Sequence, residues 1–375
     1  MANRSGNVNA QKSVAMKKKK RKRKVIIFAI EIIVLLLVLL ALFVYLKMSR
    51  INTDNTLKEE DVAQNELSDV TLANLEKYTT IALFGLDNRS NGNFSYGNSD
   101  VIMIASINNQ TKEVKLVSVY RDTYLSMTDS NKTYNKANSA YNTGGPQQAI
   151  SMLNVNLDLD ITEYVTVDFN AVTKAVDILG GVEIEVNEVE AVAMRGFIDE
   201  VAEMTGNEAN YIPGAGKYLM DGVQATAYAR VRQTKGDDFK RTQRQRIVIE
   251  KMVEKALASD LKTINDLIDG VFEDVSTSLQ YTELISLAKD AFSYSLNDSC
   301  GFPENYATAE MKLPNIKSSQ DCVIPADLSQ NVEALHEFLF ESESYEVTES
   351  VKNISEEIVY LTGKSASDGT AVVVE

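Results

Sequence analysis

The chain has 375 residues and a formal net charge of −15, a length that suits two domains or one large domain with appendages. Residues 1–24 hold ten of the 38 lysines and arginines and no acidic residue, so the remainder carries 28 basic against 53 acidic side chains, a net charge of −25. The two ends of the chain are therefore expected to meet different partners. The composition also argues against a histidine-dependent mechanism, because the single histidine, His336, lies in the apolar run ALHEFLF.

Residues 25–46 are apolar except for Glu31 and predict a transmembrane helix. As a helix they would span about 33 Å, close to the hydrocarbon thickness of a bilayer. The basic run at residues 17–24 predicts a cytoplasmic tail over residues 1–24 and places the following domain outside the cell membrane. A cleaved signal peptide would have a shorter apolar core and a small-x-small site, whereas YLKMSR follows here, so we expect an uncleaved single-pass anchor. Topology and attraction to anionic lipid explain the basic run more simply than nucleic acid does.

Residues 47–78 are polar and predict a stalk, partly helical from residue 57. The globular domain is expected over residues 79–340, and its first three apolar runs predict strands at 79–86, 101–108 and 113–120. If these strands form an antiparallel meander, one edge of the sheet collects the residues at three strand ends: Asp87, Asp100 and Arg121.

Two carboxylates beside arginines suit Mg²⁺ and a phosphate group. Mg²⁺ usually takes one or two carboxylates and completes its coordination with substrate oxygens and water. Turn chemistry is the simpler explanation for either aspartate alone, since Asp is common at strand ends. The joint placement of Asp87 and Asp100 is what favours a site.

The next segments alternate between loop, helix and strand. YNKANSAYNTGGP predicts a loop that leads into a helix from Pro146 to about Leu153, and Lys136 within it either contacts a phosphate or is solvated. A strand at 163–169, a helix at 170–179 and a strand at 182–186 follow. This alternation predicts an α/β fold, a three-layer α/β/α sandwich with a mixed central sheet, preceded by the transmembrane helix.

The most informative stretch is residues 228–256, which holds five arginines around Asp237 and Asp238. Its second half has the i, i+3, i+4, i+7 spacing of an amphipathic helix at Ile249, Met252, Val253 and Ala256. In steps of four, the buried face extends back to Gln245 and Arg241, which leaves Gln243 and Arg246 facing solvent. A buried guanidinium needs an anionic partner, so this helix predicts an anion pocket. A solvated helix start with ordinary ion pairs is the alternative.

The remaining residues carry fewer signals. Helical patterns between residues 255 and 296 should pack on the sheet. Cys300 and Cys322 are the only cysteines, and a disulfide or two buried unpaired thiols would both suit an extracytoplasmic domain. Residues 341–375 are rich in Ser, Glu and Thr and predict an acidic, partly disordered C-terminal tail.

Six ordered motifs between residues 81 and 256 resemble the LytR-CpsA-Psr family of bacterial cell-envelope proteins: FGLDNR, NSDVIMIASIN, VSVYRDTYL, YNKANSAYNTGGP, VDFNAVTKAVDILGGVEI and YARVRQTKGDDFKRTQRQR. The family combines a short cytoplasmic tail, one membrane anchor and an extracytoplasmic catalytic domain. The resemblance implies a Mg²⁺-dependent phosphotransferase. Such an enzyme moves a glycopolymer, such as teichoic acid or capsular polysaccharide, from a polyprenyl pyrophosphate carrier to peptidoglycan through a phosphodiester bond.

Carried over by position, the resemblance implies that Mg²⁺ is bound by Asp87 and Asp100. It implies pyrophosphate binding by Arg89, Arg121, Lys136, Arg230, Arg232, Arg241 and Gln245. It implies catalytic roles for Arg121, Asp238, Arg241 and Gln245. Because Asp237 and Asp238 are adjacent, the alignment of that acid could slip by one residue. The carrier lipid would need an apolar tunnel between sheet and helices, although core packing accounts for the same apolar residues.

Three other functional classes stay open on the sequence. A hydrolase that releases the lipid pyrophosphate would use the same site with water as acceptor. A membrane-bound transcriptional regulator would need a DNA-reading element, which 24 basic residues do not supply, so no nucleic acid partner is expected. A wall-binding module would not need the aspartate pair together with the arginines.

Overall fold

The computed structural model of the protein describes residues 52–53, 57, 59–86, 94–128, 132–232, 237–342 and 345–371. The predicted cytoplasmic tail and the predicted transmembrane helix at residues 25–46 lie outside these ranges. Within the described ranges, no helix has both the length and the apolar character that crossing a bilayer requires.

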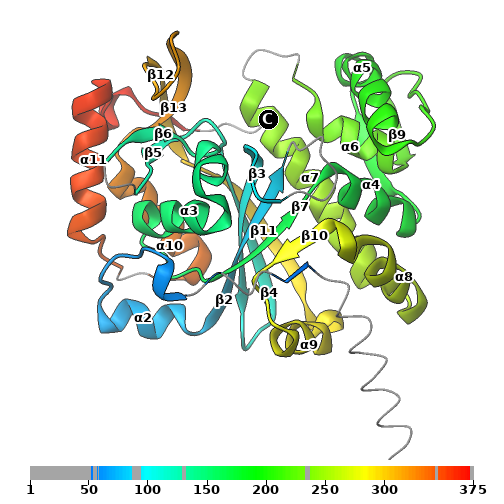
Figure 1. Ribbon diagram of the computed structural model, residues 1–375, viewed down its shortest axis with the longest axis horizontal. Helices are drawn as coiled ribbons and strands as arrows, with labels where there is room; N and C mark the ends of the chain where they lie inside the picture. The colour runs from blue at the N-terminus through cyan, green and yellow to red at the C-terminus, as the bar shows by residue number, and fades with distance from the viewer. Residues whose placement is uncertain are drawn as a thin grey trace, which may run out of the picture. The chain divides into compact units, whose positions relative to one another are not determined.

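Seven strands form a mixed central sheet in the order β1-β10-β7-β2-β3-β4-β11 (Figure 1). In this order they are β1 (Asn52–Thr53), β10 (Val275–Thr277), β7 (Glu163–Val167), β2 (Tyr78–Leu86), β3 (Ser99–Asn108), β4 (Glu113–Val119) and β11 (Ser295–Phe302). The predicted antiparallel meander of β2, β3 and β4 is confirmed. β7 pairs parallel with β2 and β11 pairs parallel with β4, which gives the sheet the mixed character that the sequence predicts.

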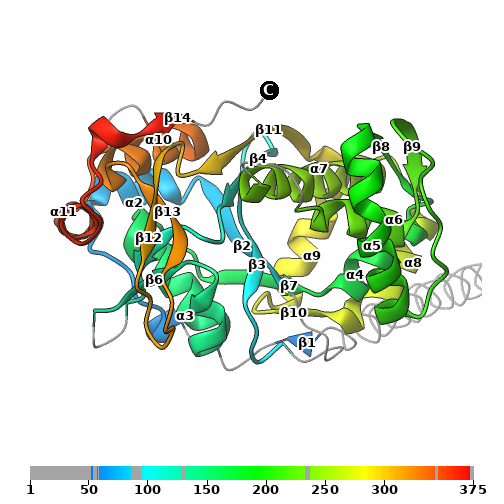
Figure 2. The same cartoon turned by 90° about the horizontal axis from the view of Figure 1, so that it is seen from above.

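Four helices gather on one side of the sheet (Figure 2). They are α2 (Asp69–Leu75), α3 (Ser139–Leu157), α10 (Leu328–Phe340) and α11 (Glu349–Thr362). Ala82, Phe84 and Leu86 point into this core, because alternate side chains of a strand face the same way. α3 begins earlier than the predicted helix start at Pro146, with non-helical backbone at two glycines, Gly144 and Gly145, that mark a kink.

The helices on the opposite side form a second layer (Figure 2). They are α4 (Phe169–Ile178), α5 (Glu188–Thr205), α6 (Gly222–Arg230), α7 (Asp237–Leu257) and α8 (Leu261–Val271), and α9 (Tyr281–Lys289) follows β10. The strand predicted at residues 182–186 is confirmed as β8 (Val182–Val186), but it pairs with β9 (Gly216–Met220) outside the central sheet. This hairpin and α4 to α7 share a second apolar core.

Two smaller β units stand beside the end of β4. β5 (Tyr124–Ser126) pairs with β6 (Tyr134–Lys136), and β12 (Asn305–Met311) pairs with β13 (Gln320–Pro325) and with β14 (Thr370–Ala371). β13 reaches the first unit through a parallel bridge between Thr123 and Val323. The residues that follow β4 are therefore held between these two units.

The described part of the predicted stalk packs on the domain and is not a free spacer. Val62 and Leu75 are buried in the first core. The Ala63 backbone N–H donates to Ser151 Oγ at 3.0 Å, and Asn65 Nδ2 donates to Asp158 Oδ1 at 2.5 Å. The polar composition of residues 47–78 did not predict this packing, because only a few of the described residues in the segment are buried.

The acidic segment from residue 341, predicted to be partly disordered, contains a helix in the residues that the structure describes there. α11 occupies residues 349–362 and buries Val351 and Ile358, which are seven residues apart and so lie on one helix face. Its N-cap Thr348 donates from Oγ1 to Asp158 Oδ1 at 2.8 Å. A Ser- and Glu-rich composition therefore conceals a helix that docks by a narrow apolar stripe.

Candidate active site

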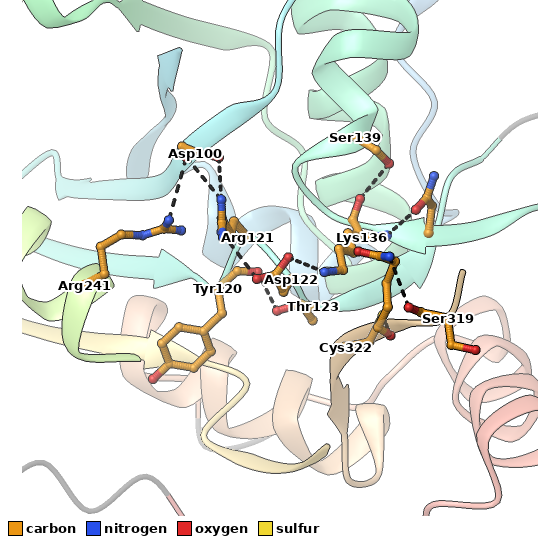
Figure 3. A network of polar contacts seen from close by, with 12 residues as sticks. Asp100, Tyr120, Arg121, Asp122, Thr123, Lys136, Ser139, Arg241, Ser319 and Cys322 are labelled. Atoms are coloured by element: carbon orange, nitrogen blue, oxygen red, sulfur yellow. Dashed lines mark hydrogen bonds and ion pairs between the residues drawn. The ribbon is translucent and has the colours of Figure 1, made fainter. Parts of the chain in front are cut away.

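The start of β3 places Asp100 among three arginines from separate parts of the chain. Arg121, which follows β4, donates from Nη1 to Oδ1 and Oδ2 of Asp100 at 3.0 and 3.2 Å. Arg232 Nη2 donates to Oδ2 at 3.1 Å, and Arg241 Nη1 of α7 lies 3.7 Å from the same oxygen. Figure 3 shows Arg121 and Arg241 converging on this carboxylate. The predicted meeting of Asp100 and Arg121 at one sheet edge is confirmed.

The inward placement of two polar side chains on α7 is also confirmed. Arg241 is 1 % exposed and Gln245 is 8 % exposed. The prediction that Arg246 faces solvent is wrong, because its side chain is only 9 % exposed. α7 packs against α6 and also against β11, where Ser299 Oγ donates to Glu250 Oε1 at 2.6 Å. Helical periodicity predicts one buried face for α7, whereas α6 and β11 cover two of its faces.

Lys136 joins the same charged cluster through Asp122. Lys136 Nζ, on β6, lies 2.8 Å from Asp122 Oδ1, and Arg121 Nε lies 3.3 Å from Asp122 Oδ2. Figure 3 shows the resulting chain of alternating charges from Asp100 to Lys136. The sequence analysis did not single out Asp122, and the only local signal was its position beside Arg121 at a strand end.

Arg230 has different partners from the other arginines. Its Nη2 lies 3.2 Å from Glu200 Oε2, and its guanidinium carbon lies 4.7 Å from the ring centre of Phe169 and 5.6 Å from that of Phe197. A guanidinium over an aromatic face is a stabilising arrangement, so these contacts hold the side chain towards α4 and α5.

For three further residues of the predicted site the structure describes no side chain. Asp87 and Arg89 lie outside the described residues. Asp238 is the second residue of α7, next to Asp237, and only its backbone is described.

An apolar cavity of about 160 Å³ lies between the sheet and the second helix layer. Asp100, Arg232 and Arg241 belong to its wall. From there the cavity follows β2 and β3, whose paired residues Gly85 with Val101 and Leu83 with Met103 lead away from the charged end. Further apolar wall residues come from β7 and three helices: Val165, Val167, Phe169, Val172, Ala229, Val248 and Ile249. The site is thus an apolar chamber with guanidinium groups at one end, which suits an amphiphile with an anionic head.

Cys300 and Cys322 are free thiols, so the disulfide interpretation is wrong and the alternative of unpaired thiols holds. Cys300 lies on β11 in the central sheet and Cys322 on β13 in a different sheet. Burial raises the pKa of Cys300 to about 12 and that of Cys322 to about 11. Both thiols are therefore protonated near neutral pH, and neither is suited to act as a nucleophile.

The sequence model of the LytR_cpsA_psr family matches residues 42–298. This match agrees with the order of the motifs and with the architecture. The chain belongs to the LytR_cpsA_psr family. It is 29 % identical over 233 residues to the polyisoprenyl-teichoic acid–peptidoglycan teichoic acid transferase TagU of Enterococcus faecalis, which covers 62 % of this chain and 71 % of that protein. It is 28 % identical over 194 residues to the corresponding transferase TagV of Bacillus subtilis, which covers 51 % of this chain.

The LytR_cpsA_psr match has a counterpart in three dimensions. The crystal structure of B. subtilis TagV superimposes with a TM-score of 0.54 at 23 % identity and covers 70 % of this chain and 97 % of the solved chain. The chain spans 47 % of the length of the curated TagV of B. subtilis. The likeness to the solved structure establishes the shared mixed α/β fold.

Proposed function

We propose that the chain is a phosphotransferase that moves a teichoic acid or another wall glycopolymer from a polyprenyl pyrophosphate carrier to peptidoglycan, with formation of a phosphodiester bond. Its relatives in E. faecalis and B. subtilis carry the name of polyisoprenyl-teichoic acid–peptidoglycan teichoic acid transferases. The observation that carries the proposal is the junction of an apolar cavity with a cluster of arginines at one end.

The donor's two parts would match the two parts of this site. A polyprenyl pyrophosphate has a long apolar tail and an anionic head, and the cavity of about 160 Å³ would receive the part of the tail next to that head. Arg121, Arg232 and Arg241 already contact one anion, the Asp100 carboxylate. Guanidinium groups bind phosphate oxygens with the same forked geometry, so these three are our proposed ligands of the pyrophosphate.

Attack by a sugar hydroxyl on the phosphorus next to the glycopolymer would release polyprenyl phosphate. Charge grows on the leaving phosphate as its bond breaks, and fixed guanidinium groups stabilise that charge. The buried amide of Gln245 lies one turn from Arg241 on α7 and would orient the same oxygens. Arg89 and Arg230 are proposed as further pyrophosphate ligands, and Asp238 as the acid that orients the acceptor hydroxyl.

Mg²⁺ is our proposed cofactor, with Asp100 and Asp87 as its protein ligands. The Asp100 side chain is 14 % exposed and belongs to the wall of the cavity at its charged end, where substrate oxygens could complete the coordination. Its oxygens also accept hydrogen bonds from arginines, so the ion would share or replace those contacts. When bound, Mg²⁺ would supply positive charge to the phosphoryl oxygens.

The predicted anchor would place this reaction at the outer surface of the cell membrane. In this proposal residues 1–24 are cytoplasmic, residues 25–46 span the bilayer and the domain is extracytoplasmic, where lipid-linked donor and peptidoglycan meet. The basic run before the span and the polar residues after it support this orientation.

The test is reconstitution of the full-length protein with Mg²⁺, a polyprenyl pyrophosphate-linked saccharide and peptidoglycan oligomers, followed by mass spectrometry. We expect a phosphodiester-linked product that Asp100→Ala and Arg241→Ala abolish, whereas Lys262→Ala, at an 82 % exposed lysine side chain, leaves it unchanged. Release of saccharide phosphate without attachment would identify a hydrolase. Donor binding without turnover would identify a binding module.

A further inference from the structure

One carboxylate outside the predicted site connects two of its cations. Asp122 is 6 % exposed, and its oxygens lie 2.8 Å from Lys136 Nζ and 3.3 Å from Arg121 Nε. Arg121 follows β4 and Lys136 lies on β6, so the Asp122 carboxylate bridges cations from two separate elements. Figure 3 shows the Asp122 carboxylate between the two cations.

The backbone around Asp122 is fixed by the neighbouring β units. The Val323 N–H of β13 donates to the Asp122 carbonyl at 2.9 Å, and the Ala137 N–H donates to the Thr123 carbonyl at 2.8 Å. Thr123 Oγ1 donates to the Tyr120 carbonyl at 2.6 Å. The carboxylate therefore projects from a backbone segment held by hydrogen bonds on both sides. Its position restricts where the Arg121 guanidinium and the Lys136 ammonium group can lie.

Arg121 is consequently held on two edges of its guanidinium plane. Asp122 Oδ2 forms an ion pair with Nε at 3.3 Å, whereas both oxygens of Asp100 accept hydrogen bonds from Nη1. Two carboxylates beside different edges of the guanidinium restrict its orientation more than a single ion pair would. The flexible ammonium arm of Lys136 is tethered to the same group.

We infer that Asp122 is a positioning residue for the proposed transfer: it holds Arg121 and Lys136 in the orientation in which they receive the pyrophosphate. The inference rests on the proposed function, because it names a role within that same site. Asp122 is not the acceptor base in this assignment, since both of its oxygens face cations and its side chain is almost fully buried.

If Asp122 positions the two cations, Asp122→Asn should raise the affinity for pyrophosphate and lower the rate of transfer. Asp122→Asn keeps the shape of the side chain but removes one negative charge between two cations. The net positive charge of the site rises, so a free anion should bind more tightly. The cations lose their common tether at the same time, so the transfer step should slow. A purely structural role would weaken both binding and transfer.

The experiment uses the full-length protein in detergent and inorganic pyrophosphate as the probe, with calorimetry for affinity and the transfer assay for kcat. We expect Asp122→Asn to bind pyrophosphate about threefold to tenfold more tightly and to lose at least tenfold in kcat. Asp290→Asn is the matched control, because Asp290 Oδ2 lies 2.7 Å from Lys112 Nζ at the opposite end of β4, and it should change neither quantity.

A second variant keeps the inference testable if Asp122→Asn does not fold. Asp122→Glu retains the charge and moves it by one methylene, so pyrophosphate affinity should stay within about twofold while kcat falls at least fivefold. Wild-type kcat in either variant, or weaker pyrophosphate binding together with slower transfer in Asp122→Asn, would overturn the positioning role alone. A wild-type protein that transfers no glycopolymer would overturn the proposed function and this inference with it.

Discussion

The only histidine of the chain gives a pH dependence of stability that can be assigned to one residue. His336 is 1 % exposed, its Nε2 lies 2.9 Å from the Leu157 carbonyl oxygen, and its ring stacks on Tyr345 with a centroid distance of 3.7 Å. Burial lowers the pKa of His336 from 6.5 to about 4, chiefly because the charged ring loses its water.

The sign of the effect follows from linkage. The unfolded chain binds a proton at His336 more readily than the folded chain, so the contribution to stability is complete above pH 6.5 and is lost as the pH falls towards 4. With these two pKa values, the free energy of unfolding should be about 1 kcal/mol lower at pH 5.5 than at pH 7. Most carboxylates with ordinary pKa values remain ionised over this interval.

Urea unfolding of the wild type and of His336→Gln at the two pH values measures this difference. The pH-dependent loss should be present in the wild type and should largely disappear in the variant, although the variant is less stable at both pH values. Because the chain has one histidine, its imidazole resonance also reports the folded-state pKa directly. An equal loss in both proteins, or an imidazole that titrates near 6.5, would refute the reasoning.

Three further predictions concern the cavity, α7 and the thiols. Val172→Trp should fill the cavity wall and raise KM at least tenfold for a long-chain donor but not for a short-chain analogue, with Val189→Trp at a 55 % exposed valine as the control. Arg246→Met should leave Tm unchanged or raise it by a few degrees in a thermal melt, because the buried Nη1 of Arg246 has no hydrogen-bond partner in the described structure and the substitution removes the cost of burying it. A large drop in Tm would contradict this. Cys300 and Cys322 should react with iodoacetamide at pH 8 far more slowly in the native protein than after denaturation, because burial raises both pKa values; rapid native alkylation would disprove their burial.

The meander and part of the site could be predicted because both depend on short-range pattern. Apolar runs separated by turns define β2, β3 and β4, and consecutive strands of this kind usually pair. Once they pair, Asp100 and Arg121 must share an edge, and the structure has them 3.0 Å apart. Likewise, helical periodicity carried the buried face of α7 back to Arg241 without any tertiary information.

The failures have a common physical cause, which is contact between elements distant in sequence. Arg246 is buried because β11, some fifty residues later in the chain, covers a second side of α7. Asp122 acquires its role from Lys136, which arrives on a two-stranded unit whose placement no local pattern predicts. The docking of α11 depends on Asp158, which accepts hydrogen bonds from Thr348 and Tyr345. Composition indicates that such segments are polar but does not indicate what they contact.

The carboxylates of the described site explain how three arginines and a lysine can lie close together there. Arg121, Arg232, Arg241 and Lys136 contribute four positive charges, and Asp100 and Asp122 contribute two negative charges, which leaves a net charge of +2 among these described residues. The carboxylates lie between the cations, so each repulsion is offset by a nearby attraction and the cluster can form before a ligand arrives. A pyrophosphate esterified at both ends carries two negative charges. These six side chains therefore carry a charge equal and opposite to that of the proposed donor, before the charges of Mg²⁺ and of the other proposed ligands are added. The same two aspartates that allow the arginines to assemble also set how much charge remains for the ligand.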